Sequence, residues 1–72
     1  MPFYDYAKLL GRIKEQGHTQ KSVSAAVGMH PSTLSQKLHG RSPFTQREIA
    51  RLCSLLGIQD SAIGKYFFAH KV

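Results

Sequence analysis

The stretch TQKSVSAAVGMHPSTLSQKLH, residues 19–39, decides the fold because it encodes two short helices with a tight turn between them. Thr19 can cap the first helix by accepting a hydrogen bond from a free backbone N–H. Gly28 allows the positive φ that ends this helix, and Pro31 fits the first position of the next one. Two short helices joined in this way have the spacing of a helix-turn-helix. We therefore expect this motif at about residues 19–39, with residues 31–39 as its second helix.

Helical spacing of apolar residues predicts three more helices outside this stretch. One begins near Asp5 and ends before Gly17. Another opens with a capping box formed by Thr45 and Glu48, and Asp60 can cap a final helix. The sequence thus predicts an all-α fold of five helices. The apolar positions that support the three additional helices are Tyr6, Leu9, Leu10 and Ile13, then Ile49, Leu52, Cys53 and Leu56, then Ile63, Tyr66 and Phe67.

Length and composition indicate one small globular domain spanning residues 1–72. Apolar residues make up 42% of the chain, which is enough for a hydrophobic core and too much for a disordered tail. The single cysteine, Cys53, cannot form an internal disulfide, so nothing points to an oxidising compartment. Apolar runs are far shorter than the roughly 18 residues that cross a bilayer, and no signal-peptide pattern is present. We expect a soluble cytoplasmic protein.

The charge is unevenly distributed along the chain. Ten Lys and Arg residues against four Asp and Glu residues give a net charge of +6, and residues 16–47 contain no acidic residue. Basic residues collected in one part of a small domain indicate a polyanionic partner, either nucleic acid or an anionic membrane surface. A membrane-surface protein needs a strongly basic amphipathic helix, which none of the five expected helices is. We therefore favour nucleic acid and expect no membrane contact.

The expected helix at residues 31–39 has an unusual outer face. Leu34 and Leu38 define its inner side, so that Ser32, Gln36 and His39 lie opposite. Short uncharged hydrogen-bonding side chains suit a surface that approaches base edges closely, and Gln can bind adenine through N6 and N7. The alternative is an ordinary polar face in contact with solvent. The candidate base-reading residues are His30, Ser32, Thr33, Ser35, Gln36 and His39.

Phosphate contacts are expected beside this helix. The N-terminus of the first helix of the motif offers free N–H groups and the positive end of a helix dipole. Such contacts fix the position of a protein on DNA without reading its sequence. Each of these residues could equally be a solvated surface group. The candidate phosphate-binding residues are Thr19, Gln20, Lys21, Lys37, Arg41, Ser42 and Arg47.

The C-terminal segment, residues 58–72, carries three aromatic residues in succession, Tyr66, Phe67 and Phe68. A helix cannot bury all three on one face, so at least one stays partly exposed. Exposed aromatic clusters mark partner surfaces, so Ile63 and these aromatics are candidates for a protein interface. The alternative is that Tyr66 or Phe67 completes the core. The interface would serve a homodimer or another protein.

Metal binding and catalysis find no support in the sequence. The histidines His18, His30, His39 and His70 are scattered, without the paired spacing of a zinc site. Cys53 lies on the apolar stripe of its helix and is expected in the core. The acidic residues are dispersed, and no phosphate-binding glycine loop is present. We expect neither an enzyme nor a cofactor.

Several segments together resemble a known family. They are GHTQ at 17–20, Val23, Val27 and Gly28, STLSQKLHG at 32–40, FTQREI at 44–49 and GKYFF at 64–68. These look like the Cro/CI-type helix-turn-helix of phage repressors and related bacterial regulators. The pattern is most similar to short Cro-like or modulator-of-repression proteins of temperate phages of Gram-positive bacteria. The resemblance covers about residues 4–66. Where this chain has His30, the family often has Ser or Thr as the helix cap.

The resemblance implies a lambda-repressor-like fold and two alternative activities. In the first, the protein is a transcriptional regulator that binds double-stranded operator DNA with the helix at residues 31–39, usually as a dimer. In the second, it is an antirepressor that binds the phage CI repressor protein, through the helix-turn-helix or the C-terminal surface. We favour the first on the sequence alone. The operator sequence and the oligomeric state stay open.

Overall fold

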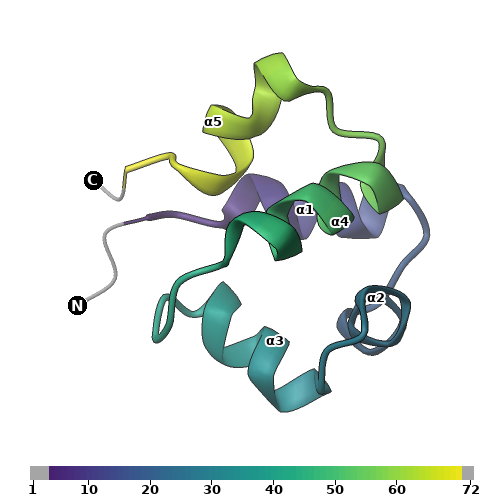
Figure 1. Cartoon of the computed structure of the whole chain (residues 1–72). Coiled ribbons are helices and arrows are strands. Elements are labelled where there is room, and N and C mark those ends of the chain that lie inside the picture. Colours follow the sequence, from purple (N-terminus) through teal and green to yellow (C-terminus); the bar gives the residue numbers. More distant parts are fainter. Residues whose placement is uncertain (1–3, 71–72) are drawn as a thin grey trace.

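In the computed structural model, which describes residues 4–70, the chain forms five α-helices and one short 3-10 helix (Figure 1). Within these residues the only β pairing is an isolated bridge between Tyr4 and His70. The predicted all-α fold with five helices is therefore confirmed. The helices are α1 Ala7–Glu15, α2 Gln20–Val27, α3 Pro31–Leu38, α4 Gln46–Leu56 and α5 Ile63–Phe67, with the 3-10 helix η1 at Asp60–Ala62.

The helices are arranged in three groups along the molecule. Figure 1 shows α2 and α3 at one end of the molecule and α5 at the other, with α1 and α4 between them. α2 packs against both α3 and α4, and α1 packs against α5. In the part of the chain that the structure describes, no helix combines the length and the apolar character that a membrane crossing requires.

Local chemistry sets the helix ends near the turn, as the sequence predicts. Thr19 Oγ1 accepts the N–H of Ser22, and Ser22 Oγ accepts the N–H of Thr19, which closes a capping box at the start of α2. Gly28 ends α2 with a φ of 74°, a conformation that favours glycine. Thr45 and Glu48 form the predicted capping box at the start of α4. Local side-chain and backbone chemistry thus sets both ends of α2 and the start of α4.

The prediction that Asp60 caps the last helix is wrong. Gln59, with an extended backbone at φ −74° and ψ 153°, takes the cap position of η1, and Asp60 is the first residue of that turn. The α-helix α5 begins only at Ile63 and has no side-chain cap. The chain tightens into a 3-10 turn first, so the α-helix starts later than the capping pattern suggests.

Every α-helix contributes apolar side chains to one core. The aromatic rings of Tyr6, Phe44 and Phe67 meet there edge to face, with ring centroids 5.3 Å apart for the first pair and 5.6 Å for the second. Cys53 is buried as predicted, and burial, followed by the charge of Asp60, raises the pKa of its thiol. The buried apolar residues are Tyr6, Leu9, Ile13, Val23, Val27, Leu34, Leu38, Leu52, Cys53, Leu56, Ile58 and Phe67.

Two arginines connect helices through the carbonyl groups that the helix ends leave free. Arg12 of α1 donates from Nε to the carbonyl of Leu56 at 2.9 Å and from Nη2 to that of Gly57 at 3.2 Å. Arg51 of α4 donates from Nη1 to the carbonyl of Val27 at 3.1 Å. Each guanidinium places positive charge at the negative end of a helix dipole, where it is favourable. The C-termini of α2 and α4 are thus held by side chains from other helices.

Candidate functional site

The outer edge of α3 is polar and open, as the helical geometry predicts. Leu34 and Leu38 are buried, while Ser32, Gln36 and His39 are exposed on the opposite side. The edge therefore presents hydrogen-bonding groups outward without a competing apolar surface. Thr33 and Ser35, at the flanks of this edge, are half-buried.

His30 caps α3 in place of the Ser or Thr that usually stands there. Its Nδ1 accepts the N–H of Ser32 at 3.1 Å and lies 2.8 Å from the hydroxyl of the same residue. Since the N–H donates to Nδ1, that nitrogen carries a lone pair and the proton of the neutral ring is on Nε2. His30 and Ser32 thus form one unit at the start of α3.

Two other histidines also bond to nearby helical groups. Nδ1 of His39 lies 2.7 Å from the carbonyl oxygen of Ser35, to which it must donate. Nδ1 of His18 lies 3.0 Å from the hydroxyl of Ser22. Among residues 4–70, no group of three or more His, Cys, Asp or Glu side chains is placed to hold a metal ion.

The structure does not support Lys37 as a phosphate-binding residue. Its side chain is directed into the molecule, the residue is only 9% exposed, and Nζ donates to Oε1 of Glu48. The same oxygen accepts the backbone N–H of Thr45 at 2.8 Å. Burial opposes ionisation of Glu48, but the hydrogen bonds from Lys37 and Thr45 outweigh it and hold the pKa of this carboxyl below its usual value. Lys37 instead ties α3 to the start of α4.

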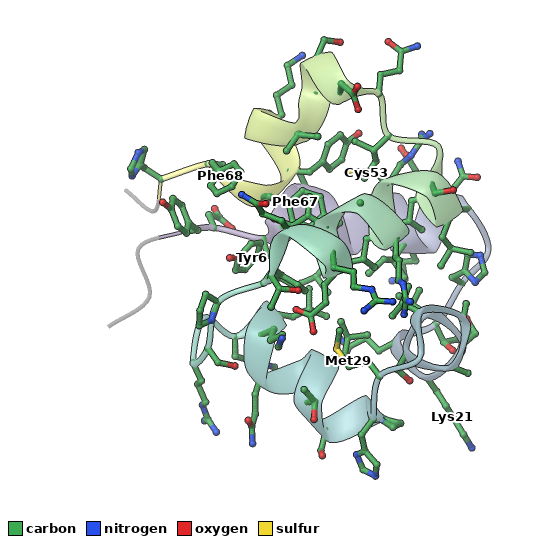
Figure 2. The ribbon with its side chains drawn as sticks, viewed as in Figure 1. Tyr6, Lys21, Met29, Cys53, Phe67 and Phe68 are labelled. Carbon is green, nitrogen blue, oxygen red and sulfur yellow. The ribbon has the colours of Figure 1, made fainter. Side chains whose placement is uncertain are left out.

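The other predicted phosphate-binding residues lie at the surface. Lys21 projects from α2 into solvent (Figure 2). Thr19 is exposed too, although its hydroxyl oxygen already accepts the N–H of Ser22. Apart from Lys37, the predicted phosphate-binding residues can therefore still contact an anionic partner. Among these predicted phosphate-binding residues, the exposed ones are Thr19, Gln20, Lys21, Arg41 and Arg47, whereas Ser42 is half-buried.

Sequence reasoning assigned no role to the lysines of α1, which extend the cationic surface. Lys8 and Lys14 are both exposed. The acidic residues of this region are engaged locally, because Asp5 accepts the N–H of Ala7 at 2.9 Å and Glu15 pairs with Arg12 at 3.4 Å. The surface along α1 therefore carries positive charge that its acidic neighbours do not fully neutralise.

The C-terminal aromatics divide between core and surface. Phe67 is only 1% exposed, so of the two alternatives that the sequence leaves open it belongs to the core and not to a protein interface (Figure 2). It follows Ile63 by four residues and therefore shares the inner face of α5. Ile63 and Tyr66 are partly buried against the core. Phe68, the residue after α5, is 47% exposed and is the aromatic that a partner can reach.

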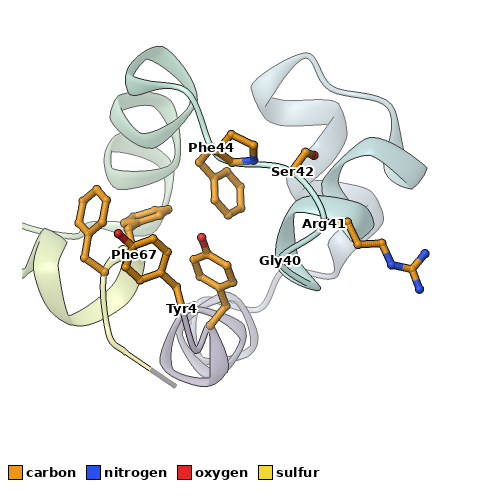
Figure 3. A pocket seen from close by; sticks show the side chains of 9 residues that line it. Tyr4, Gly40, Arg41, Ser42, Phe44 and Phe67 are labelled. Carbon is orange, nitrogen blue, oxygen red and sulfur yellow. The ribbon is translucent and has the colours of Figure 1, made fainter. Parts of the chain in front are cut away.

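An aromatic hollow of about 340 Å³ opens beside Phe68. Figure 3 shows the rings of Tyr4, Phe44 and Phe67 around it, while the side chain of Arg41 extends away from the rings. Burial, and then the neighbouring Tyr4, raise the pKa of Tyr6 in its wall. The hollow, called the aromatic hollow below, is lined by Tyr4, Tyr6, Gly40, Arg41, Ser42, Pro43, Phe44, Phe67 and Phe68.

Sequence reasoning missed most of this hollow. Tyr4, Tyr6 and Phe44 come from the N-terminal segment and from the loop after α3, and only folding brings them to Phe67. Helical periodicity carries no information about such a meeting of loops. The available signal was compositional, since Tyr4 and Phe44 are aromatic residues outside the expected helices.

The small all-helical fold matches that of a small phage regulator. The structure matches the solution structure of the modulator of repression (MOR) of the temperate bacteriophage TP901-1 from Lactococcus lactis with a TM-score of 0.79. The two sequences are 38% identical, over 96% of this chain and 93% of that one. The predicted similarity to regulators from phages of Gram-positive bacteria is therefore confirmed.

Residues 1–70 match the family described as "Protein of unknown function (DUF739)", and the chain belongs to this family. A search of curated proteins found no match.

Proposed function

We propose that this protein is a phage regulator that modulates repression by binding the repressor protein of its own phage. The likeness to the modulator of repression of TP901-1 carries this proposal, at 38% identity over 96% of the chain. An identity of this size over nearly the whole chain makes shared surfaces plausible, beyond a shared fold. Antirepression thereby becomes the favoured alternative over direct operator binding.

The aromatic hollow is the surface that best suits a protein partner. Protein interfaces draw most of their binding energy from buried aromatic and arginine side chains. Phe68, which is 47% exposed, lines the hollow, and so does Arg41, whose side chain extends away from the rings. A partner side chain that enters the hollow would bury Phe68 and the edge of Tyr4 together. A carboxylate on the partner would pair with Arg41.

The test is a titration of the purified cognate repressor, followed by calorimetry. Phe68→Ala should weaken binding by at least about tenfold, because it removes an exposed aromatic anchor. The matched control is Lys65→Ala, an exposed change on α5 outside the aromatic hollow, which should alter affinity less than about twofold. Absence of repressor binding by the unaltered protein would overturn the proposal.

Binding of operator DNA is the second candidate, and the outer edge of α3 favours it. Gln36 is exposed and opposite Leu34, where it can reach a base edge in a major groove. Gln36→Ala should then weaken binding to the correct site by about 1–3 kcal/mol and leave non-specific DNA binding nearly unchanged. Arg41→Ala should lower the slope of the logarithm of DNA affinity against the logarithm of salt concentration by about one unit. Equal loss on both kinds of DNA would remove Gln36 from a base-reading role.

A further inference from the structure

Two more hollows continue from the aromatic hollow along α1. The second, of about 180 Å³, shares Tyr4 and Tyr6 with the aromatic hollow. The third, of about 470 Å³, lies beside the start of α2 and shares Leu10 with the second. Because each neighbouring pair has lining residues in common, the three hollows lie next to one another along α1. Together they are called the α1 groove below.

The exposed apolar side chains of the molecule lie on this groove. Leu10 is 39% exposed and Phe68 is 47% exposed, and they are the two large hydrophobic residues that are exposed among residues 4–70. Phe68 lines the first hollow, and Leu10 separates the second from the third. Exposed apolar groups joined by hollows indicate a surface that is covered by a partner. The partner must therefore reach both Phe68 and Leu10.

Gly11 supplies a second observation at the third hollow. It lies inside α1 with no positive φ, and a Cβ built on it would meet nothing within 4 Å. Glycine weakens a helix interior, and neither the backbone nor the packing of this protein requires it here. An exposed glycine leaves the helix backbone open to close approach by another chain. Gly64 of α5 shares this openness, but only Gly11 lines one of the three hollows, so only there does the open backbone adjoin a surface that a partner could cover.

The charges along the groove indicate what that partner carries. Arg41 lines the first hollow and Lys14 the third, and both are exposed. Asp5, which lines the second hollow between them, accepts the N–H of Ala7 and keeps its negative charge, so the cations lie at the ends of the groove and not in its middle. Acidic side chains on a partner would therefore find cations at both ends of the groove.

We propose that the α1 groove binds one continuous acidic, amphipathic segment of the repressor protein. Apolar side chains of the segment enter the hollows, its backbone runs along α1 past Gly11, and its carboxylates meet Lys14 and Arg41. The inference rests on the proposed function and extends it from one hollow to the whole of α1. The segment must span α1, which has nine residues and is about 13 Å long.

The first experiment fills the groove without changing charge. Gly11→Gln places a long neutral side chain in the third hollow, while Gly64→Gln does the same on α5, where the space is also open. Both changes improve helix propensity, so neither should lower the melting temperature. Binding of the cognate repressor should weaken at least about tenfold for Gly11→Gln and less than about twofold for Gly64→Gln.

The second experiment removes charge at matched positions. Lys14→Gln should weaken repressor binding and reduce its salt dependence, whereas Lys65→Gln on α5 should do neither. If the unaltered protein, Gly11→Gln and Lys14→Gln all bind the repressor equally, the groove is refuted and the proposed function stands. If the unaltered protein binds no repressor, both fall. If Gly11→Gln instead weakens binding of operator DNA, the groove belongs to a DNA interface and the inference is overturned.

Discussion

At the scale of single residues, His30 shows how one ring can position a whole surface. It stands where Ser, Thr, Asp or Asn usually caps a helix, and it serves the same purpose through Nδ1. The same nitrogen contacts the hydroxyl of Ser32, the first exposed polar group of the α3 edge. The direction of Ser32 and the start of α3 therefore depend on the same ring.

His30→Ala should lower the free energy of unfolding by about 1 kcal/mol, because the N–H of Ser32 loses its acceptor. His30→Ser, which restores a common cap, should recover most of this loss. Urea denaturation measures both. Gln59→Ala is the control, since Gln59 caps η1 without a side-chain hydrogen bond and its loss should cost little. Equal costs for the two alanine variants would show that the ring does not act as a cap.

The pair of Lys37 and Glu48 makes stability depend on pH in the acid range. The pKa of Glu48 in the folded protein lies below its ordinary value of 4.5, so the carboxylate stabilises the fold above that pH. This contribution is lost as the pH falls through the lowered pKa and the carboxylate takes up a proton. The melting temperature of the unaltered protein should thus fall between about pH 5 and pH 3.

Glu48→Gln should have a flatter melting profile over the same range, and thermal scans in matched buffers will show the difference. The control is Glu15→Gln, whose carboxylate is exposed and pairs with Arg12 at 3.4 Å. A profile for Glu48→Gln as steep as that of the unaltered protein would assign the acid sensitivity to other groups.

At the scale of helices, the ends of α2 and α4 are completed from across the fold. Neither helix has a basic residue in its last turn, and the positive charge comes instead from Arg51 and Arg12. These hydrogen bonds join residues that are 24 and 44 positions apart in the sequence. They therefore stabilise helix packing as well as the helix ends.

Arg51→Ala should lower the free energy of unfolding by about 1 kcal/mol, because the carbonyl of Val27 loses its donor. Arg47→Ala is the matched control on the same helix, with an exposed side chain, and should change stability by less than about 0.5 kcal/mol. Guanidinium denaturation distinguishes the two. If Arg47→Ala costs as much as Arg51→Ala, the loss reflects net charge or helix propensity.

Sequence chemistry predicts helix ends better than it predicts helix partners. Thr19, Gly28 and Thr45 act on neighbours within a few residues, so their roles can be predicted from the local sequence. Lys37 and Glu48 are 11 residues apart, and nothing in their separate helices indicates that they meet. The late start of α5 could not be predicted from the sequence either, because a 3-10 turn and an α-helix share the same capping signals.

At the scale of the whole molecule, Phe67 connects α5 to the loop after α3 and, through that loop, to the segment before α1. Its ring meets Phe44 from the loop after α3, and Phe44 meets Tyr6 before α1. One side of this aromatic cluster completes the core, and the other side forms the wall of the aromatic hollow. Stability and the candidate site therefore share the same rings. This sharing could not be predicted, since periodicity placed Phe67 equally well in the core or at an interface.

Phe67→Ala should remove about 3–5 kcal/mol of stability, which approaches or exceeds what a core of this size supplies. We expect a largely unfolded protein at 37 °C by far-ultraviolet circular dichroism. Phe68→Ala, at the next position but exposed, should remain folded with a nearly unchanged melting temperature. Similar destabilisation by the two variants would contradict the division of the C-terminal aromatics into core and surface.

The pairing of Tyr4 with His70, supported by a 2.7 Å hydrogen bond from the N–H of Asp5 to the carbonyl of Ala69, brings the two ends of the described chain together. Circular permutation is therefore geometrically simple, with a short linker between Tyr4 and His70. The same proximity matters for protein engineering. A fusion partner joined directly to Tyr4 or His70 would lie beside the aromatic hollow that Tyr4 and Phe68 line, where it would obstruct whatever docks there.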